Sequence, residues 1–164
     1  MKVEPLNRSF GAKVSELSLP DLNQDQVQDI YQLWLQYALL IFPQQNLTNS
    51  QQIEFAKNFG ALEFDLSPIS NVRNDGSIRD ANDDDIVKSL KGNMEWHHDS
   101  TYMPIQAKGA VFTAHKVPKK GGETGWADMR AAYEGLSNAM KEKIEDLSAF
   151  HSYEWSQKER FGHK

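Results

Sequence analysis

Cysteine is absent from the chain, and so is any long hydrophobic run. Without cysteine there is no disulfide scaffold and no thiolate metal site, and a reducing compartment is the natural setting. The longest apolar run covers residues 37–42, far short of the roughly 20 residues that a membrane-spanning helix needs. Residues 1–6 lack the apolar core of a secretory signal peptide. We therefore expect a soluble, cytoplasmic protein that has no membrane partner.

Clustered positive charge is also missing. The net charge is −5, and the nearest basic runs, residues 116–120 and 158–164, are short and interrupted. Proteins that bind nucleic acid usually carry a basic patch or stripe, so nucleic acid is not an expected partner. With 164 residues the chain is long enough for one hydrophobic core and too short to presume two. We expect a single domain over residues 1–164.

Two helices stand out among the patterns that the sequence does contain. Residues 24–34 carry apolar side chains at the spacing of one helix face. Thr48 and Gln51 fit a capping box, in which each side chain binds the backbone N–H of the other residue at a helix start. This second helix would turn three residues toward the core: Ile53, Ala56 and Phe59. Further helices are expected at residues 128–135 and after Ser137.

Short runs of strand-forming residues alternate with these helices, which predicts an α+β fold. Residues 73–91 interrupt the pattern with an acidic run and little periodicity, and two interpretations of this segment stay open: a functional lid or a solvated loop without a role. The expected strands cover residues 9–19, 38–42, 69–72, 95–101, 110–117 and 123–126.

One stretch, residues 95–101 with the sequence EWHHDST, puts a histidine and an aspartate two positions apart. Successive side chains of an extended segment point to opposite faces, so His97 and Asp99 would share one face and His98 would take the other. Their backbones would lie roughly 6.5 Å apart, and both side chains could converge on one metal ion. An imidazole and a carboxylate are two-thirds of the two-histidine-one-carboxylate triad of non-haem Fe(II) oxygenases. An ordinary surface histidine and aspartate are the alternative.

Five segments carry a resemblance that extends over most of the chain. They are residues 10–12 (FGA), 39–45 (LLIFPQQ), 52–63 (QIEFAKNFGALE), 93–99 (NMEWHHD) and 121–136 (GGETGWADMRAAYEGL). In this order and at these spacings they resemble the taurine dioxygenase and 2,4-dichlorophenoxyacetate dioxygenase family of Fe(II)- and 2-oxoglutarate-dependent oxygenases. The resemblance implies a double-stranded β-helix, a jelly-roll core with flanking helices.

The same resemblance implies a role for five residues. His97 and Asp99 match the two neighbouring iron ligands of the family. Thr124 matches the position whose hydroxyl binds the distal carboxylate of 2-oxoglutarate, and Trp126 would line the pocket for that cosubstrate. Asn93 matches a position that contacts the substrate. For Trp126 a core aromatic stays open, and for Asn93 a residue that caps a loop.

The family's reaction would then follow: Fe(II), 2-oxoglutarate and O₂ hydroxylate a small organic substrate, and succinate and CO₂ are released. The expected substrates are anionic, of the sulfonate, alkyl sulfate or aryloxyalkanoate type, and a homo-oligomer is left open. No residue up to Lys164, the last residue, matches the family's second histidine ligand or its 2-oxoglutarate-binding arginine. We therefore expect only the N-terminal part of the fold, either as a section of a longer protein or as a true fragment. A non-catalytic binding or oligomerisation module and a zinc-dependent hydrolase are the alternative functions.

Overall fold

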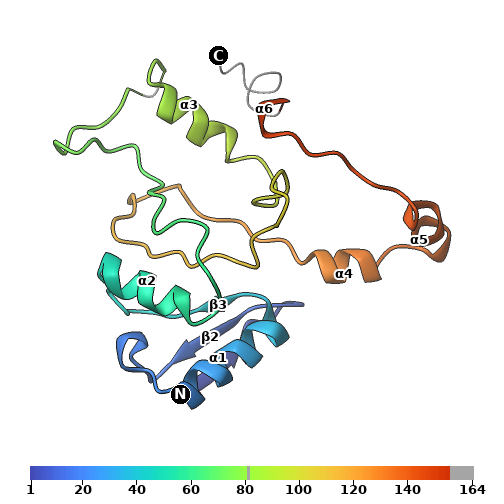
Figure 1. Cartoon of the computed structure of the whole chain (residues 1–164), viewed down its shortest axis with the longest axis horizontal. Coiled ribbons are helices and arrows are strands. Elements are labelled where there is room, and N and C mark those ends of the chain that lie inside the picture. Colours follow the sequence, from blue (N-terminus) through green and yellow to red (C-terminus); the bar gives the residue numbers. More distant parts are fainter. Residues whose placement is uncertain (81, 156–164) are drawn as a thin grey trace. The chain divides into compact units, whose positions relative to one another are not determined.

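The computed structural model describes residues 1–80 and 82–155, and this part of the chain forms two compact units (Figure 1). Unit 1 comprises Met1–Leu62 and Val111–Leu147, and unit 2 comprises Glu63–Ala110 with the described part of Ser148–Lys164. A mixed β-sheet and several helices give the predicted α+β composition. Among the described residues, no helix has the length and apolar character that crossing a membrane requires.

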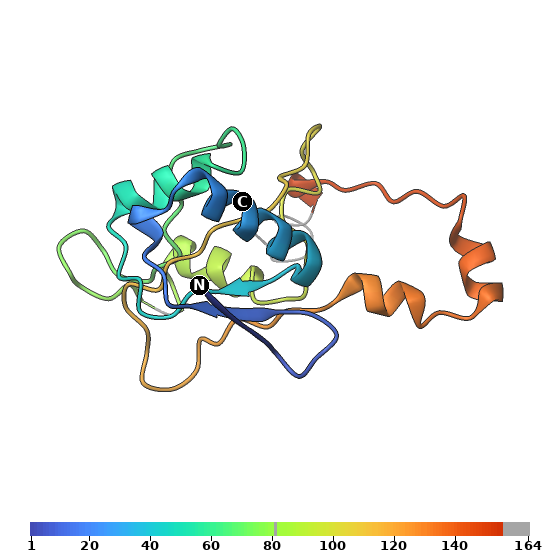
Figure 2. The same ribbon diagram turned by 90° about the horizontal axis from the view of Figure 1, so that it is seen from below.

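The sheet of unit 1 has three strands. β1 (Lys2–Pro5) pairs antiparallel with β2 (Ala12–Ser15), and β2 pairs in parallel with β3 (Leu40–Ile41). The hairpin of β1 and β2, in dark blue, is seen in Figure 2. Gly11 is the last residue of the loop between β1 and β2, and its φ is 93°. A Cβ at this position would lie 2.8 Å from Leu6 Cδ1. The hairpin therefore requires glycine here, because only glycine adopts this conformation without strain and leaves room for leucine.

Capping residues start the helices of unit 1 where the sequence predicts them. Asn23 and Gln26 form a capping box at α1 (Gln24–Tyr37), and Thr48 and Gln51 form another at α2 (Asn49–Lys57). Each box satisfies backbone N–H groups that the first helical turn leaves without partners. The other helical elements of unit 1 are η1 (Leu19–Asp21), α4 (Met129–Glu134), capped by Asp128, and α5 (Asn138–Ile144), capped by Ser137.

The prediction for the buried face of α2 is confirmed for Phe59, which packs against the buried cluster of unit 1, but it missed the most buried residue of the helix. Ile53, Ala56 and Phe59 are only partly buried, whereas Phe55, which the periodicity did not assign to the core, is 6% exposed. Its ring centroid lies 5.8 Å from that of Phe42 and 5.2 Å from that of Phe59, both edge to face. A helix of nine residues has a weak apolar periodicity, and the largest side chain decides which face is buried. Three further side chains complete the buried cluster: Leu19, Ile30 and Leu47.

Unit 2 contains two helices, α3 (Asp85–Gly92) and α6 (Tyr153–Trp155). The prediction that residues 73–91 lack regular structure is wrong for the second half of this segment, which forms α3. Asp84 caps the helix through Ile86 N–H, and Val87 is 8% exposed. A helix of eight residues has too few turns for its apolar face to stand out in the sequence.

Several predicted strands are wrong as well. Residues 69–72 contribute only an isolated bridge between Val72 and Ile78, and residues 95–101, 110–117 and 123–126 are irregular or turn-forming. Of residues 38–42 only Leu40–Ile41 is a strand, because Ala38 ends α1 in the left-handed conformation. Strand-forming side chains become a strand only where a partner supplies hydrogen bonds, and the partner is not encoded in the local pattern.

Candidate functional site

His97 and Asp99 point their polar atoms toward each other in unit 2. His97 Nε2 lies 3.1 Å from Asp99 Oδ1, and His97 Nδ1 lies 2.6 Å from the carbonyl oxygen of Glu95. Since a carbonyl oxygen only accepts, Nδ1 carries a proton, and Nε2 is the nitrogen turned toward the carboxylate. A metal ion bound between Nε2 and Oδ1 would take the place of a proton shared by these two atoms.

The backbone around the pair is a turn and not the predicted strand. Glu95 N–H donates to Gly92 O at the end of α3, and Met103 N–H donates to Ser100 O. Ser100 has a φ of 59°, which turns the chain immediately after Asp99. The two side chains therefore meet because the chain folds back on itself, and the predicted reason, a shared strand face, is wrong.

The surroundings of the pair are negatively charged. The pKa of Tyr102 is raised by burial, and the negative charges of Glu63 and Asp99 add to this effect. Ser100 Oγ donates to Glu63 Oε2 over 3.3 Å, which brings Glu63 to the turn that holds the pair. Sequence reasoning missed Glu63 and Tyr102, because a contact across 37 positions leaves no local signal. A negative environment favours a bound cation.

His98, the neighbouring histidine, has different partners. Its Nδ1 lies 2.8 Å from the carbonyl oxygen of Asp99 and 2.9 Å from Nε2 of Gln106. The Asp99 carbonyl holds a proton on this nitrogen, as the Glu95 carbonyl does on Nδ1 of His97, and the difference between the two rings is the carboxylate oxygen 3.1 Å from Nε2 of His97. His98 therefore contributes to the local hydrogen bonding, whereas Nε2 of His97 is turned toward the carboxylate.

Asn93 occupies the C-cap of α3, in the same unit as the pair. Its backbone N–H donates to Lys91 O and Ser89 O, and its side chain is exposed. Two further turns, Met94 N–H to Lys91 O and Glu95 N–H to Gly92 O, connect this cap to the pair. The end of α3 thus determines where the backbone of the pair begins.

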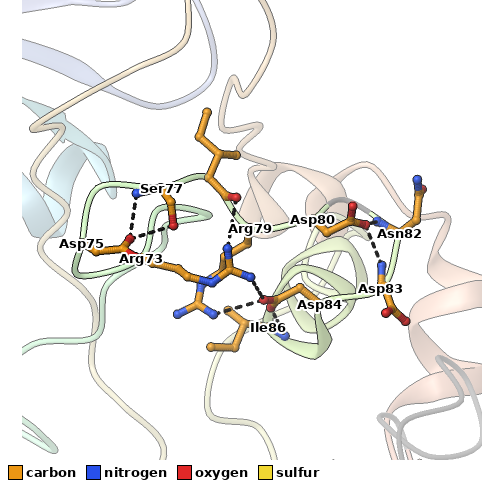
Figure 3. Close-up of polar contacts among 10 residues, drawn as sticks. Arg73, Asp75, Ser77, Arg79, Asp80, Asn82, Asp83, Asp84 and Ile86 are labelled. Atoms are coloured by element: carbon orange, nitrogen blue, oxygen red, sulfur yellow. Dashed lines mark hydrogen bonds and ion pairs between the residues drawn. The ribbon is translucent and has the colours of Figure 1, made fainter.

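The start of α3 is held by two arginines that bind one carboxylate (Figure 3). Arg73 Nη2 and Arg79 Nη1 lie 3.1 Å and 3.2 Å from Asp84 Oδ2, while Asp84 Oδ1 accepts from Ile86 N–H. Burial raises the pKa of Asp84, but the hydrogen bonds from Arg79 and Ile86 N–H outweigh it and hold the pKa below its usual value. Arg73 Nη1 also donates to Ile78 O over 3.2 Å, which closes the loop before the helix.

Thr124 and Trp126 belong to unit 1, and the pair of His97 and Asp99 belongs to unit 2. Thr124 is exposed in an irregular segment. Trp126 is 47% exposed, and its ring centroid lies 5.9 Å from that of Phe112. The alternative of a core aromatic therefore does not fit Trp126, because half of its surface is open.

A pocket of about 250 Å³ lies at α4 and α5, and it holds none of the predicted site residues. Its lining is mostly polar and charged: Tyr133, Asn138, Lys141, Glu142 and Glu145. In the part of the chain that the structure describes, no group of three or more His, Cys, Asp or Glu side chains is placed to hold a metal ion. His97 and Asp99 are thus a pair of donors and not a full set of ligands.

The geometry of this pair nevertheless fits a divalent cation. Two ligands of about 2.1 Å bond length at a right angle lie about 3.0 Å from each other, close to the separation of Nε2 and Oδ1. The carbonyl of Glu95 fixes the tautomer and the ring orientation, as hydrogen-bond acceptors commonly do for metal-binding histidines. An imidazole and a carboxylate suit Fe(II) and Mn(II) as ligands.

Comparisons with known proteins relate the chain to a family of dioxygenases. The family described as "Taurine catabolism dioxygenase TauD, TfdA family" matches residues 2–164. An (S)-phenoxypropionate/alpha-ketoglutarate-dioxygenase of Sphingobium herbicidovorans is 54% identical over 99% of this chain, and an alpha-ketoglutarate-dependent 2,4-dichlorophenoxyacetate dioxygenase of Cupriavidus pinatubonensis is 34% identical over 90%. The crystal structure of AAD-2 in complex with Mn(II) and N-oxalylglycine matches all of this chain with a TM-score of 0.87 and 34% identity.

These matches cover only part of each relative. The chain spans 56% of the length of the Sphingobium and Cupriavidus proteins and 61% of the AAD-2 chain. The family model nevertheless covers almost every residue of the chain, so the resemblance of the five sequence segments is confirmed. The chain belongs to the TauD/TfdA family of dioxygenases.

Proposed function

We propose that this chain carries the first two metal ligands of an Fe(II)- and 2-oxoglutarate-dependent dioxygenase that hydroxylates a small anionic substrate. The observation that carries the proposal is the arrangement of His97 and Asp99, in which Nε2 of the imidazole lies 3.1 Å from Oδ1 of the carboxylate. The relatives named above support it, since two of them are named as alpha-ketoglutarate-dependent dioxygenases.

An aryloxyalkanoate is the substrate class that we propose. Two relatives, 54% and 46% identical to this chain, are named as (S)-phenoxypropionate dioxygenases, while an alkylsulfatase relative is 29% identical. Such a substrate combines an aromatic ring with a carboxylate. Asn93 is the residue that we propose for substrate contact, because its exposed amide can donate a hydrogen bond to a carboxylate.

Each site residue has a defined task in this proposal. Bound Fe(II), with 2-oxoglutarate and O₂, supplies the oxidising chemistry that hydroxylates the substrate and releases succinate and CO₂. The carbonyl of Glu95 holds the proton on His97 Nδ1, so Nε2 is available as a ligand, and Asp99 contributes the negative charge. The Thr124 hydroxyl would donate to the distal carboxylate of 2-oxoglutarate, and the exposed face of Trp126 would exclude water beside it.

We also propose the double-stranded β-helix as the fold of the whole domain, with residues 1–164 as one part of a single dioxygenase domain. The match of the family model to residues 2–164 supports this assignment. Because the curated relatives are longer than the matched region, the remaining iron ligand and the 2-oxoglutarate-binding arginine are proposed to come from residues outside 1–164.

Metal binding by the chain itself tests the pair of ligands. We expect His97→Ala to weaken the binding of Mn(II) more than about 100-fold, since removing a ligand has a larger effect than the 10–100-fold known for the residues that orient ligands. His98→Ala is the matched control, because it removes the same ring one position away and should change the affinity less than about threefold. Mn(II) electron paramagnetic resonance measures both. Equal losses in the two variants would contradict the ligand assignment.

Succinate formation tests the reaction. The protein should convert 2-oxoglutarate to succinate in the presence of Fe(II), ascorbate and an aryloxyalkanoate, and more slowly with alkyl sulfates or sulfonates. If the protein binds Mn(II) through His97 but forms no succinate with any of these substrates, the result would favour the alternative of a non-catalytic binding module. Hydrolysis without consumption of 2-oxoglutarate would favour a zinc-dependent hydrolase.

A further inference from the structure

The segment that carries Thr124 and Trp126 ends at Asp128, a nearly buried carboxylate in unit 1. The side chain of Asp128 is 9% exposed and accepts from Arg130 N–H over 3.0 Å and from Ala131 N–H over 3.1 Å. Hydrogen bonds from Ala131 N–H and from the Ser9 side chain lower the pKa of this carboxyl. Asp128 thus joins the start of α4 to the loop between β1 and β2.

Arg130 extends this anchor to α1. Its Nη1 donates to Leu35 O over 3.2 Å and its Nη2 donates to Gln36 O over 3.4 Å. The two contacts join residues 95 and 94 positions apart. The last turn of α1 has no basic residue of its own, so Arg130 supplies both the donors and the positive charge that the carbonyl end of a helix favours.

The same segment is held at a second point. The ring of Trp126 packs against that of Phe112. Val111, the residue before Phe112, packs against the buried cluster of unit 1. Val111 O accepts from Gln52 Nε2 over 2.9 Å, which ties this contact to α2. Thr124 lies close in sequence to both anchors and outside any strand.

We propose that Asp128 and Arg130 are positioning residues for the cosubstrate segment: by tying its end to the carbonyl terminus of α1, they hold Thr124 where it binds the carboxylate of 2-oxoglutarate. The inference rests on the proposed function of Thr124. An irregular segment has no ladder of hydrogen bonds to fix it, so its course depends on the points at which it is anchored. Arg130 acts through Asp128 and the backbone and does not contact the cosubstrate in this proposal.

The binding of N-oxalylglycine by the full-length protein in the presence of Mn(II) is the test, since the AAD-2 structure contains both. Arg130→Met removes the donors and keeps most of the side-chain length. We expect its dissociation constant for N-oxalylglycine to rise about threefold to thirtyfold, the range for changes that act on a site through its support. Arg130→Lys keeps a charged donor that reaches one carbonyl, and it should restore part of the affinity. Isothermal titration calorimetry gives the constants.

Two controls separate positioning from general stability. Arg8→Met makes the same chemical change at an exposed arginine and should leave the affinity unchanged. Ile30→Val lowers the stability of unit 1 through its core, and thermal unfolding shows whether Arg130→Met is destabilised to the same degree. The inference is overturned if Ile30→Val and Arg130→Met both lose affinity for N-oxalylglycine in proportion to their loss of stability. It is also overturned if Arg130→Met binds N-oxalylglycine as tightly as the unaltered protein. Failure of the proposed function would instead be seen in the unaltered full-length protein, which would then bind no N-oxalylglycine.

Discussion

Phe55→Ala should destabilise the chain more than any other truncation in α2, although the periodicity of the sequence favours Ile53. Phe55 is 6% exposed and belongs to the buried cluster, and truncation of a buried phenylalanine costs about 3–5 kcal/mol, which includes the cavity that it leaves. Its edge-to-face contacts with Phe42 and Phe59 place the value in the upper part of this range, because such pairs contribute about 0.5–1.5 kcal/mol beyond their buried area.

Ile53 provides the comparison within the same helix. Its side chain is only partly buried, so Ile53→Ala should cost about 1–2 kcal/mol, below the range for fully buried isoleucine. A domain of ordinary stability, about 5–15 kcal/mol, survives this loss but comes close to unfolding when Phe55 is truncated. Phe55→Leu keeps an apolar side chain and provides a variant that folds.

Urea unfolding followed by far-ultraviolet circular dichroism measures these differences. For a urea dependence of about 2 kcal/mol per molar, Phe55→Ala should lower the midpoint by about 2 M and Ile53→Ala by less than about 1 M. Phe55→Leu should fall between these values. If Ile53→Ala lowers the midpoint as far as Phe55→Ala does, α2 buries the face that the periodicity predicts, and the packing described above is wrong.

Two further predictions concern residues that start helices. Thr48→Ala should lower the free energy of unfolding by about 1 kcal/mol, because it removes the acceptor of Gln51 N–H at the start of α2, while Thr48→Ser should be close to neutral in thermal unfolding. Asp84→Asn keeps a capping side chain but loses the charge that Arg73 and Arg79 share. Burial raises the pKa of Asp84, but the hydrogen bond from Arg79 and other contacts lower it overall. The charged form of Asp84 therefore stabilises the fold at pH values above the ordinary pKa of 3.8. This stabilisation is lost as the pH falls through the pKa of the folded state. The difference in urea midpoint between Asp84→Asn and the unaltered chain should therefore be present at pH 7 and close below about pH 3.8, and a constant difference would contradict the role of the charge.

Helix starts were predictable because the interactions that make them are local. The capping box of Thr48 and Gln51 spans three positions, and the caps at Asp128 and Ser137 also act within three positions. All residues of such a motif lie within a few positions of each other, so the motif can be recognised in a short stretch of sequence. The helix α3 was not predicted, although its cap is also local. The capping residue, Asp84, lies in an acidic run that is equally typical of a solvated loop.

Strands and buried faces depended on partners far away in the chain. β2 is a strand because β1 and β3 supply hydrogen bonds on both sides, whereas residues 110–117 have similar side chains and form no strand in the described structure. The anchoring of Arg130 to the end of α1, across about 95 positions, leaves no mark in a local window either. The resemblance to a family supplied the candidate site residues, and the contacts that hold their backbone in place came only from the structure.

The pair of His97 and Asp99 shows how a motif can be found for a reason that does not hold. A strand would bring the two side chains to one face, but Ser100 in the left-handed conformation turns the chain instead. What survives the change is the spacing of two positions, which leaves both side chains within reach of one ion in a turn as well as in a strand. The turn adds something that a strand would not: the carbonyl of Glu95 is free of a sheet partner and accepts the proton of His97 Nδ1. This hydrogen bond holds a proton on Nδ1 and turns Nε2 toward the carboxylate, so the irregular backbone, rather than the alternation of a strand, orients the ring in the proposed ligand pair.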